Sequence, residues 1–233
     1  MSERRAFFIT GTDTEVGKTT VTLALLAAAR TKSLRTVALK PVAAGCEFIA
    51  GRRSNADARL LQQAATCKLD YEQVNPVALA EPIAPHLAAE RESRVLSVDE
   101  LIAAIRPVYD KQWNLLLIEG AGGWLVPLNK TETLADLARV LELPVILVVA
   151  IRLGCLNHAL LSAQSITANG LTLAGWVANC VDGDMLQAQA NIDTLCQRLP
   201  APCLGIIPYL SDGAGGNQAD ASPYLILEPL LSC

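Results

Sequence analysis

Three consecutive residues, Gly17, Lys18 and Thr19, have the types and order that hold phosphate groups. They follow a short apolar run and precede a helix-length apolar segment, which is the context that a phosphate-binding loop requires. Backbone N–H groups at a helix N-terminus attract phosphate oxygens, the lysine adds a positive charge, and the threonine hydroxyl can reach magnesium. The sequence therefore predicts a site for a nucleoside triphosphate, with an accidental surface turn as the alternative.

The spacing of this loop is unusual. The common pattern GxxxxGK[ST] has four residues between its glycines, whereas Gly11 and Gly17 enclose five. Gly11 is therefore not the standard first glycine, and we interpret residues 11–19 as a variant P-loop.

A second candidate is Glu119, which ends the apolar run 113–118 and is followed by Gly120, Ala121 and Gly122. An acid at the carboxyl end of a strand is placed to hold magnesium, and the glycines allow backbone N–H groups to approach a ligand. The alternative is an ordinary glycine-rich turn.

A second lysine, Lys40, ends another apolar run. In an open parallel sheet the carboxyl ends of the strands line the ligand crevice, so Lys40 can face Lys18. Two ammonium groups beside a triphosphate suit transfer of a phosphoryl group to an anionic acceptor. A solvated lysine at a strand end is the alternative.

Two further residues remain open from spacing alone. Asp57 lies just before the apolar pair 60–61, which suits either a helix cap or a metal ligand. Asn179 ends another strand candidate, where its amide could pair with the donor and acceptor edge of adenine or be a satisfied buried amide.

The elements that must position these residues follow from the apolar pattern. Strands are predicted for residues 6–10, 36–40, 113–119, 145–151, 173–179 and 203–208. Helices are predicted for residues 18–30, 98–109, 134–141, 157–168 and 185–198. The alternation indicates a mainly parallel sheet, and the strands lack a polar face, so helices should cover both sides. We therefore expect one doubly wound α/β domain of the P-loop NTPase type over residues 1–233.

Local signals support these boundaries. Ser97 and Glu100 form a capping-box signature, and Gly170 is a natural stop for the helix before it. The helix after the P-loop is apolar nearly all round, so it should be covered on more than one side, and a subunit interface could supply that cover. Segments 43–75 and 211–222 are predicted as loops or short helices near a site.

Composition excludes several classes of protein. The net charge is −4 and there is no basic block, which disfavours nucleic acid binding. The longest apolar stretch, 143–151, is too short to span a bilayer, and run 6–9 is too short for a signal peptide, so we expect a cytoplasmic protein. Seven cysteines without a CxxC pair indicate reduced thiols rather than a zinc or redox site.

Five stretches together resemble the dethiobiotin synthetase family: residues 11–19, 40–42, 119–124, 154–159 and 175–179. The resemblance runs nearly end to end, and the five-residue P-loop spacing is the family's own form. It implies a ligase that joins 7,8-diaminononanoate, carbon dioxide and ATP into dethiobiotin, ADP and phosphate. The implied intermediates are a carbamate and a carbamic-phosphoric anhydride.

The resemblance also implies roles for residues of this sequence. Lys18 and Lys40 would be catalytic, and Mg²⁺ would be held by Thr19, Asp57 and Glu119. The nucleotide would be bound by Thr14, Glu15, Val16, Gly17, Lys18, Thr19, Thr20, Asp57, Glu119, Gly120, Ala121, Gly122, Asn179, Pro208, Tyr209 and Leu210. The substrate would be bound by Thr14, Ala44, Arg152, Gly154, Cys155 and Asn157. The family is a homodimer, so residues 152–157 would act from the partner subunit.

The sequence departs from the family at Ala44, where related enzymes can carry a serine, and at Cys180, where an acid can occur. A ribose contact near residues 211–213 cannot be aligned. A diverged copy with a related substrate is therefore one alternative. Another is a ParA or MinD-like ATPase switch, although residues 13–16 lack the signature lysine of that class. A third is the synthetase part of a cobyrinate-type amidotransferase, for which this chain ends too early to hold a glutaminase domain.

Overall fold

The computed structural model describes residues 4–210 and 218–232. Its central sheet has six strands in the order β10-β9-β8-β1-β7-β2, and every pairing in it is parallel. The strands are β1 (Arg5–Gly11), β2 (Thr36–Leu39), β7 (Leu115–Glu119), β8 (Val145–Ala150), β9 (Leu173–Asn179) and β10 (Cys203–Ile207). All six predicted strands are present, so the prediction of a mainly parallel sheet is confirmed.

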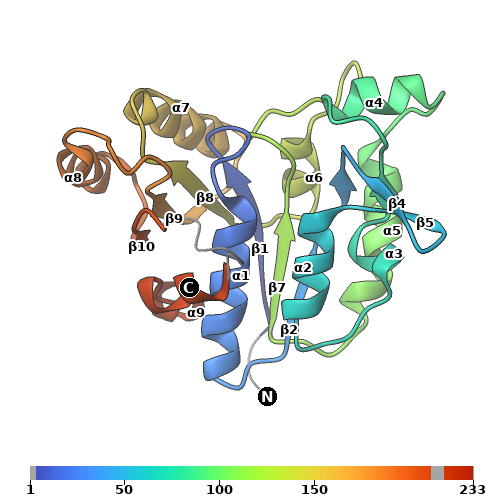
Figure 1. The fold of residues 1–233 in the computed structure, drawn as a ribbon, viewed down its shortest axis with the longest axis horizontal. Coiled ribbons are helices and arrows are strands. Elements are labelled where there is room, and N and C mark those ends of the chain that lie inside the picture. The colour runs from blue at the N-terminus through green and yellow to red at the C-terminus, as the bar shows by residue number, and fades with distance from the viewer. Residues whose placement is uncertain (1–3, 211–217, 233) are drawn as a thin grey trace.

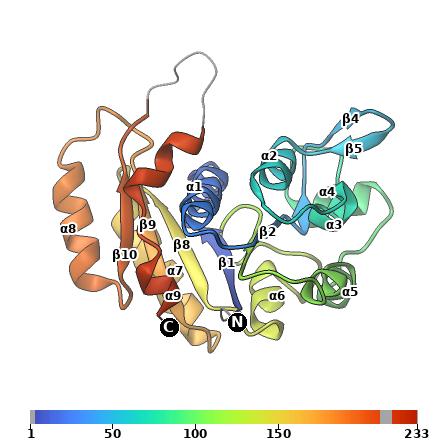
Figure 2. The same ribbon diagram turned by 90° about the horizontal axis from the view of Figure 1, so that it is seen from below.

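The sheet is covered on both faces (Figures 1 and 2). Alternate residues of β1 point to opposite sides: Phe7 and Ile9 join one buried apolar cluster, and Phe8 joins the other. The first cluster includes residues of α1 (Lys18–Thr31), η1 (Gln218–Tyr224) and α9 (Glu228–Leu231). The second includes residues of α5 (Val98–Tyr109), α6 (Leu134–Val140), α7 (Cys155–Ala168) and α8 (Ala188–Arg198). The doubly wound α/β fold is therefore confirmed.

The long connection from β2 to β7 carries smaller elements that the apolar pattern did not resolve. They are β3 (Val42–Ala43), β4 (Glu47–Ile49), β5 (Arg52–Ser54), α2 (Ala56–Ala64), α3 (Tyr71–Val74), β6 (Val77–Ala78) and α4 (Pro85–Arg91). β3 pairs with β6 in parallel, and β4 with β5 antiparallel. Segment 43–75 thus contains short elements, as expected. Residues 211–217 of the second predicted loop segment lie outside the described residues.

Two predicted helix starts were wrong by a few residues. α7 begins at Cys155 rather than at residue 157, directly after Gly154 with its positive φ of 94°. α8 begins at Ala188 rather than at residue 185, because Gln187 before it is left-handed. Gly170 ends α7 as predicted, with φ 77°.

The capping signature before α5 is half present. The Ser97 hydroxyl accepts a hydrogen bond from the Glu100 amide at 3.2 Å. The Glu100 carboxylate does not complete a box with the Ser97 amide but instead binds Arg94.

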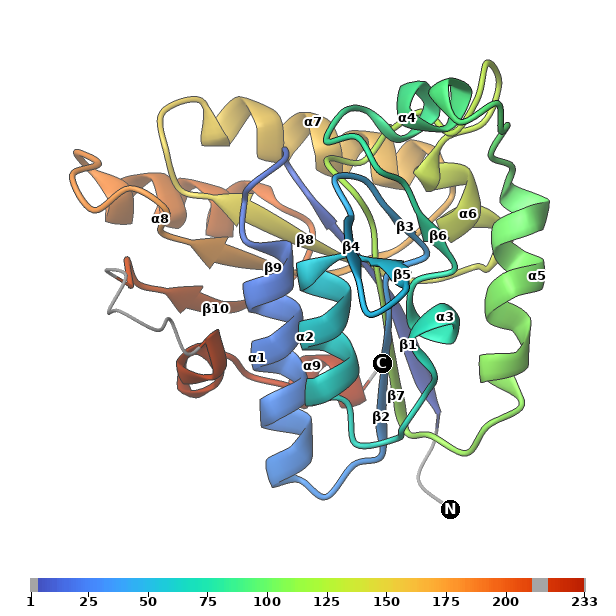
Figure 3. The same ribbon diagram turned by 45° about the vertical axis from the view of Figure 1, so that its right-hand side comes forward.

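The apolar helix α1 is covered within its own chain. It lies against the sheet on one side and against α2 and η1 on others (Figure 3). Leu25 and Leu26 are therefore fully buried in one subunit. The predicted cover on more than one side is confirmed, and α2 and η1 supply it within the chain. A subunit interface at α1 stays a prediction.

No helix in the described ranges 4–210 and 218–232 has the length and apolar character needed to cross a bilayer.

Candidate functional site

The variant P-loop joins β1 to α1. Gly17 has φ 87° and precedes the first helical residue. A Cβ at this position would lie 2.1 Å from Nδ2 of Asn179, so both the backbone conformation and the close approach require glycine. Glu15 is also left-handed, with φ 58°, and Val16 between them is buried. The loop thus packs against Asn179 at Gly17 and against the apolar core through Val16.

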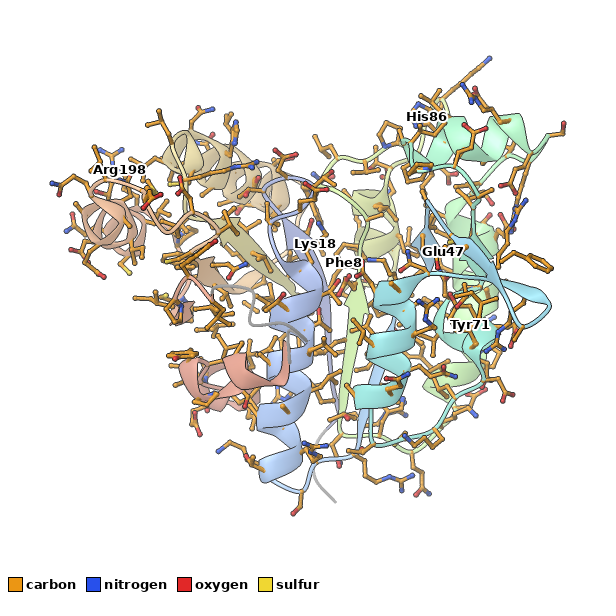
Figure 4. The ribbon with its side chains drawn as sticks, in the orientation of Figure 1. Phe8, Lys18, Glu47, Tyr71, His86 and Arg198 are labelled. Atoms are coloured by element: carbon orange, nitrogen blue, oxygen red, sulfur yellow. The ribbon has the colours of Figure 1, made fainter. Side chains whose placement is uncertain are left out.

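Lys18, the first residue of α1, is nearly buried, and its ammonium donates to the carbonyl of Asp13 at 3.1 Å. Burial and the neighbouring charge of Lys40 lower the pKa of Lys18 to about 8, although Glu119 and nearby aspartates oppose this shift. Figure 4 shows Lys18 at the N-terminal end of α1, near the carboxyl end of the central strands. An anion bound beside Lys18 would stabilise its charged form, which burial and Lys40 disfavour.

Glu119 lies at the end of β7 and is fully buried. Its Oε1 accepts hydrogen bonds from the Thr19 hydroxyl at 2.8 Å and from Lys40 Nζ at 2.6 Å. The Thr22 hydroxyl lies 2.9 Å from Oε2 and 2.8 Å from the carbonyl of Lys18, and its one proton is shared between these two acceptors. An ordinary glycine-rich turn does not account for a fully buried carboxylate with three such partners. The sequence analysis missed Thr22, whose only signal is its position one turn after Lys18 on the same helix.

Lys40 is 5% exposed, so the alternative of a solvated strand-end lysine is wrong. Burial opposes its charge, but the carboxylates of Glu119 and Asp57 outweigh burial and raise the pKa of Lys40 above its ordinary value. Its ammonium lies 3.5 Å from Oδ2 of Asp57. Lys40 therefore stays charged at neutral pH while bridging two carboxylates.

The two interpretations of Asp57 are separated by the start of α2. The N-cap is Asn55, whose side-chain oxygen accepts from the Ala58 amide at 3.2 Å. Asp57 lies in the first turn instead, half-exposed, with its carboxylate beside Lys40. The helix-cap interpretation was therefore wrong, and the metal role stays a prediction.

These groups border a single cleft of about 880 Å³, which we call the P-loop cleft. The predicted site residues that line it are Thr14, Glu15, Gly17, Lys18, Thr19, Thr20, Lys40, Ala44, Asp57, Glu119, Ala121 and Gly122. The sequence analysis missed Ala43, Asn55, Pro82, Ile83, Ala84, Pro85, Gly123, Leu125, Val126 and Pro127, which line it too. Most of these are apolar residues in two segments, 82–85 at the start of α4 and 125–127 between β7 and α6, and such segments carry no periodic signal in the sequence.

Of the predicted nucleotide-binding residues outside that lining, Val16 belongs to the P-loop itself, Gly120 contacts the end of β1, and Asn179 contacts the P-loop. Val16 is buried, and Gly120 donates its amide hydrogen to the carbonyl of Ile9 at 2.9 Å. The Asn179 amide, at the end of β9, donates to the carbonyl of Val16 at 2.9 Å. This bond supports the buried-amide interpretation of Asn179, and its adenine contact stays a prediction.

The predicted border at Pro208, Tyr209 and Leu210 follows β10. Tyr209 lines a separate hollow of about 380 Å³ with residues 181–184. The ribose contact considered near residues 211–213 lies outside the described residues. Pro208, Tyr209 and Leu210 are not among the described residues that line the P-loop cleft.

The predicted substrate residues at the start of α7 also lie outside the P-loop cleft. Arg152 instead pairs with Asp13 of the P-loop, with 2.7 Å between Nη2 and Oδ2. Cys155 is only 2% exposed and packs in the core, whereas Gly154 and Asn157 are exposed. A role from a partner subunit therefore stays a prediction.

Solved structures share this fold at low sequence identity. The MinC:MinD cell division protein complex of Aquifex aeolicus matches with a TM-score of 0.56 and 13% identity, covering 94% of this chain and 87% of that chain. Chloroplast FtsY of Physcomitrella patens matches with a TM-score of 0.53 and 17% identity, covering 100% and 65%. At such identities the likeness shows the fold alone.

Sequence relatives are much closer. A family model described as an AAA domain matches residues 5–215. "ATP-dependent dethiobiotin synthetase BioD" of Cellvibrio japonicus is 55% identical over 228 residues, with 98% of each chain covered. Proteins of the same name from Pseudomonas aeruginosa strain UCBPP-PA14 and Marinobacter nauticus are 54% and 45% identical, covering 97% and 98% of each chain. The chain therefore belongs to the ATP-dependent dethiobiotin synthetase family.

Proposed function

We propose that this chain is an ATP-dependent dethiobiotin synthetase, with residues 1–233 as one catalytic domain working in the cytoplasm. It would close the ureido ring of dethiobiotin from 7,8-diaminononanoate and carbon dioxide, and release ADP and phosphate. The observation that carries the proposal is the placement of two buried lysines, Lys18 and Lys40, in the same cleft as the P-loop. Nucleotide binding alone needs one of them, whereas phosphoryl transfer to an anion is served by both.

The chemistry proceeds in three steps. One amine of the diamine adds to carbon dioxide and loses a proton, giving a carbamate anion. A carbamate oxygen then attacks the γ-phosphorus of ATP, the bond to the bridging oxygen breaks, and ADP leaves. The second amine attacks the carbamoyl carbon of the resulting anhydride, expels phosphate and loses a proton as the ring closes.

The charges of the cleft suit the second step. A carbamate and a triphosphate repel each other, so their approach requires positive charge between them. Lys18 would hold the phosphates from the P-loop, and Lys40, charged because Glu119 and Asp57 stabilise its ammonium, would face the carbamate. Such positioning and neutralisation serve the reaction without a strong base.

The residues present also fit a magnesium ion. The Thr19 hydroxyl and Glu119 Oε1 lie 2.8 Å apart. The ammonium of Lys40 contacts the carboxylates of both Asp57 and Glu119, so these two acids lie near each other. All three donors are oxygens, as Mg²⁺ prefers. Among the described residues there is no cluster of three or more His, Cys, Asp or Glu suited to a metal, which agrees with an ion that completes its shell with water and phosphate. When bound, magnesium would neutralise charge on the transferred phosphoryl group.

The apolar part of the cleft suits the alkyl chain of the diamine. Segments 82–85 and 125–127 contribute isoleucine, leucine, valine and prolines to its wall. Thr14 and Ala44 also line the cleft, and we assign them to the substrate. We also propose a homodimer in which residues 152–157 of one subunit bind the substrate carboxylate at the other subunit's site.

The test is phosphate release from ATP with magnesium and bicarbonate, with and without 7,8-diaminononanoate, combined with mass spectrometry of the organic product. We expect release that depends on the diamine and a product with the mass of dethiobiotin. Release independent of the diamine, or ATP binding without turnover, would contradict the proposal. A diverged paralogue would then be identified by supplying related vicinal diamines.

A further inference from the structure

A buried chain of polar side chains connects the end of β2 to the start of α2. Asn75 donates from Nδ2 to the carbonyl of Lys40 at 2.7 Å and approaches the carbonyl of Val77 at 3.2 Å. Its Oδ1 accepts from the Tyr71 hydroxyl at 2.9 Å. The Tyr71 hydroxyl in turn accepts from the backbone amide of Asn55 at 2.7 Å.

This chain forms a closed ring with the charged residues of the cleft. Asn55 is the N-cap of α2, and Asp57 lies two residues later in the first turn of that helix. The Asp57 carboxylate then returns to Lys40, 3.5 Å from its ammonium. The ring therefore runs from the carbonyl of Lys40, through Asn75 and Tyr71, to the carboxylate that faces the ammonium of the same lysine.

The ring lies just beyond the end of β2, where the backbone amide of Lys40 donates to the carbonyl of Val74 at 2.8 Å. β2 ends at Leu39, so the Lys40 carbonyl has left the β2–β7 ladder and takes its partner from Asn75 instead. Asn75 and Tyr71 are each 2% exposed, and hydrogen bonds in such a setting fix geometry strongly because water cannot replace them. Nothing in the reaction chemistry requires either residue to touch a substrate.

We propose that Tyr71 and Asn75 are positioning residues, which set the place of the Lys40 ammonium by fixing the end of β2 against the first turn of α2. The role of Lys40 in turnover rests on the proposed function. The effect of the hydrogen-bonded ring on the position of the Lys40 ammonium does not depend on that function. The two parts can therefore be tested separately.

The variant is Tyr71→Phe. It keeps the aromatic group, which packs in the core and lies under Arg52, but it removes the hydroxyl that links Asn55 to Asn75. Tyr109→Phe is its matched control, because the Tyr109 hydroxyl is buried and has no hydrogen-bond partner among the described residues. We expect Tyr71→Phe to lower kcat about tenfold, the size of one lost buried hydrogen bond. The KM for ATP should stay within about twofold, because the P-loop is not part of the ring. The control should keep the wild-type kcat.

A second readout does not depend on turnover. Brief labelling with acetic anhydride at pH 8, followed by digestion and mass spectrometry, measures how accessible the Lys40 side chain is to the reagent. We expect slow labelling of Lys40 in the wild type and in Tyr109→Phe, because the side chain is 5% exposed, and labelling about threefold faster or more in Tyr71→Phe, where local opening exposes it. Exposed Lys32 serves as an internal reference.

Unchanged Lys40 labelling in Tyr71→Phe, with only a lower melting temperature, would overturn the positioning role and leave a structural one. A raised KM for ATP at constant kcat would overturn it too. Absence of diamine-dependent turnover in the wild type sinks the proposed function instead, and the labelling result still decides whether the ring positions the lysine.

Discussion

Lys40 and Glu119 form a buried ion pair, with 2.6 Å between Nζ and Oε1, at the carboxyl ends of two adjacent parallel strands. The register of β2 and β7 pairs Leu39 with Ile118. The residues that follow them, Lys40 and Glu119, therefore lie side by side. This register places Lys40 beside Glu119, which also accepts a hydrogen bond from Thr19 of the P-loop.

Replacement of Lys40 should abolish most turnover. Lys40→Met keeps the length of the side chain but removes the charge, so the carbamate and the phosphoryl group lose one stabilising partner. We expect kcat for diamine-dependent phosphate release to fall by about 10²–10³, with ATP still bound. Lys32→Met, at an exposed ion pair with Glu228, is the control and should be active. A Lys40→Met enzyme with near wild-type kcat would remove this lysine from the chemistry.

Gly17→Ala should prevent normal nucleotide binding. The added methyl group would lie 2.1 Å from the Asn179 amide in a backbone with φ +87°. Gly51→Ala is a matched control, since Gly51 has φ +83° but nothing within 4 Å of the new Cβ. Both variants carry the strain of a left-handed residue, about 1 kcal/mol, whereas only Gly17→Ala should weaken ATP affinity, by tenfold or more. Calorimetric titration with ATP measures this, and equal affinities of the two variants would contradict it.

ATP binding to the free protein should weaken as the pH rises through about 8. Burial, and next the charge of Lys40, lower the pKa of Lys18 to about 8 from 10.5, so its ammonium is lost in that range and the phosphates lose a charged partner. Titrations of ATP between pH 7 and 9.5 measure the change. Lys18→Arg, which cannot lose its proton there, should lack this pH dependence, and an equally steep loss of affinity in that variant would assign the effect to another group.

The same shift has a consequence for stability. Because folding lowers the pKa of Lys18, the unfolded chain binds more protons than the folded one between pH 8 and 10.5. The contribution of Lys18 to the free energy of unfolding therefore rises with pH across this window and is unfavourable below it. Denaturant titrations of the wild type and Lys18→Met at pH 7.5 and 9.5 should show a smaller difference between the two proteins at the higher pH.

Thr22→Val should reduce turnover through Glu119. The substitution keeps the shape of the side chain but removes the hydroxyl 2.9 Å from Oε2, so the carboxylate that faces Thr19 and Lys40 is less well oriented. We expect a fall in kcat of about fivefold and a higher magnesium requirement, while Thr22→Ser restores both. A Thr22→Ser enzyme as impaired as Thr22→Val would show that the methyl group, not the hydroxyl, matters.

The sequence by itself determined the framework of this site. The six strands are short apolar runs separated by longer segments, most of them of helix length. Because these signals are local, they can be read from the sequence without knowing which residues meet in the fold. The P-loop, Glu119 and Lys40 each follow such a run. Since parallel strands present their carboxyl ends at one edge, their meeting in one cleft could be expected.

Tertiary structure alone decided which partners these residues have. From spacing alone, Asp57 could be a helix cap or a metal ligand. In the folded chain Asn55 is the N-cap of α2, and the Asp57 carboxylate lies beside Lys40. It also brings Tyr71 and Asn75 behind the lysine and lines the cleft with two apolar loops. The contacts to Lys40 cross long stretches of chain, such as the 35 residues to Asn75. Which residues make them depends on strand register, loop conformation and buried hydrogen bonding, and these features produce no periodic pattern in the sequence.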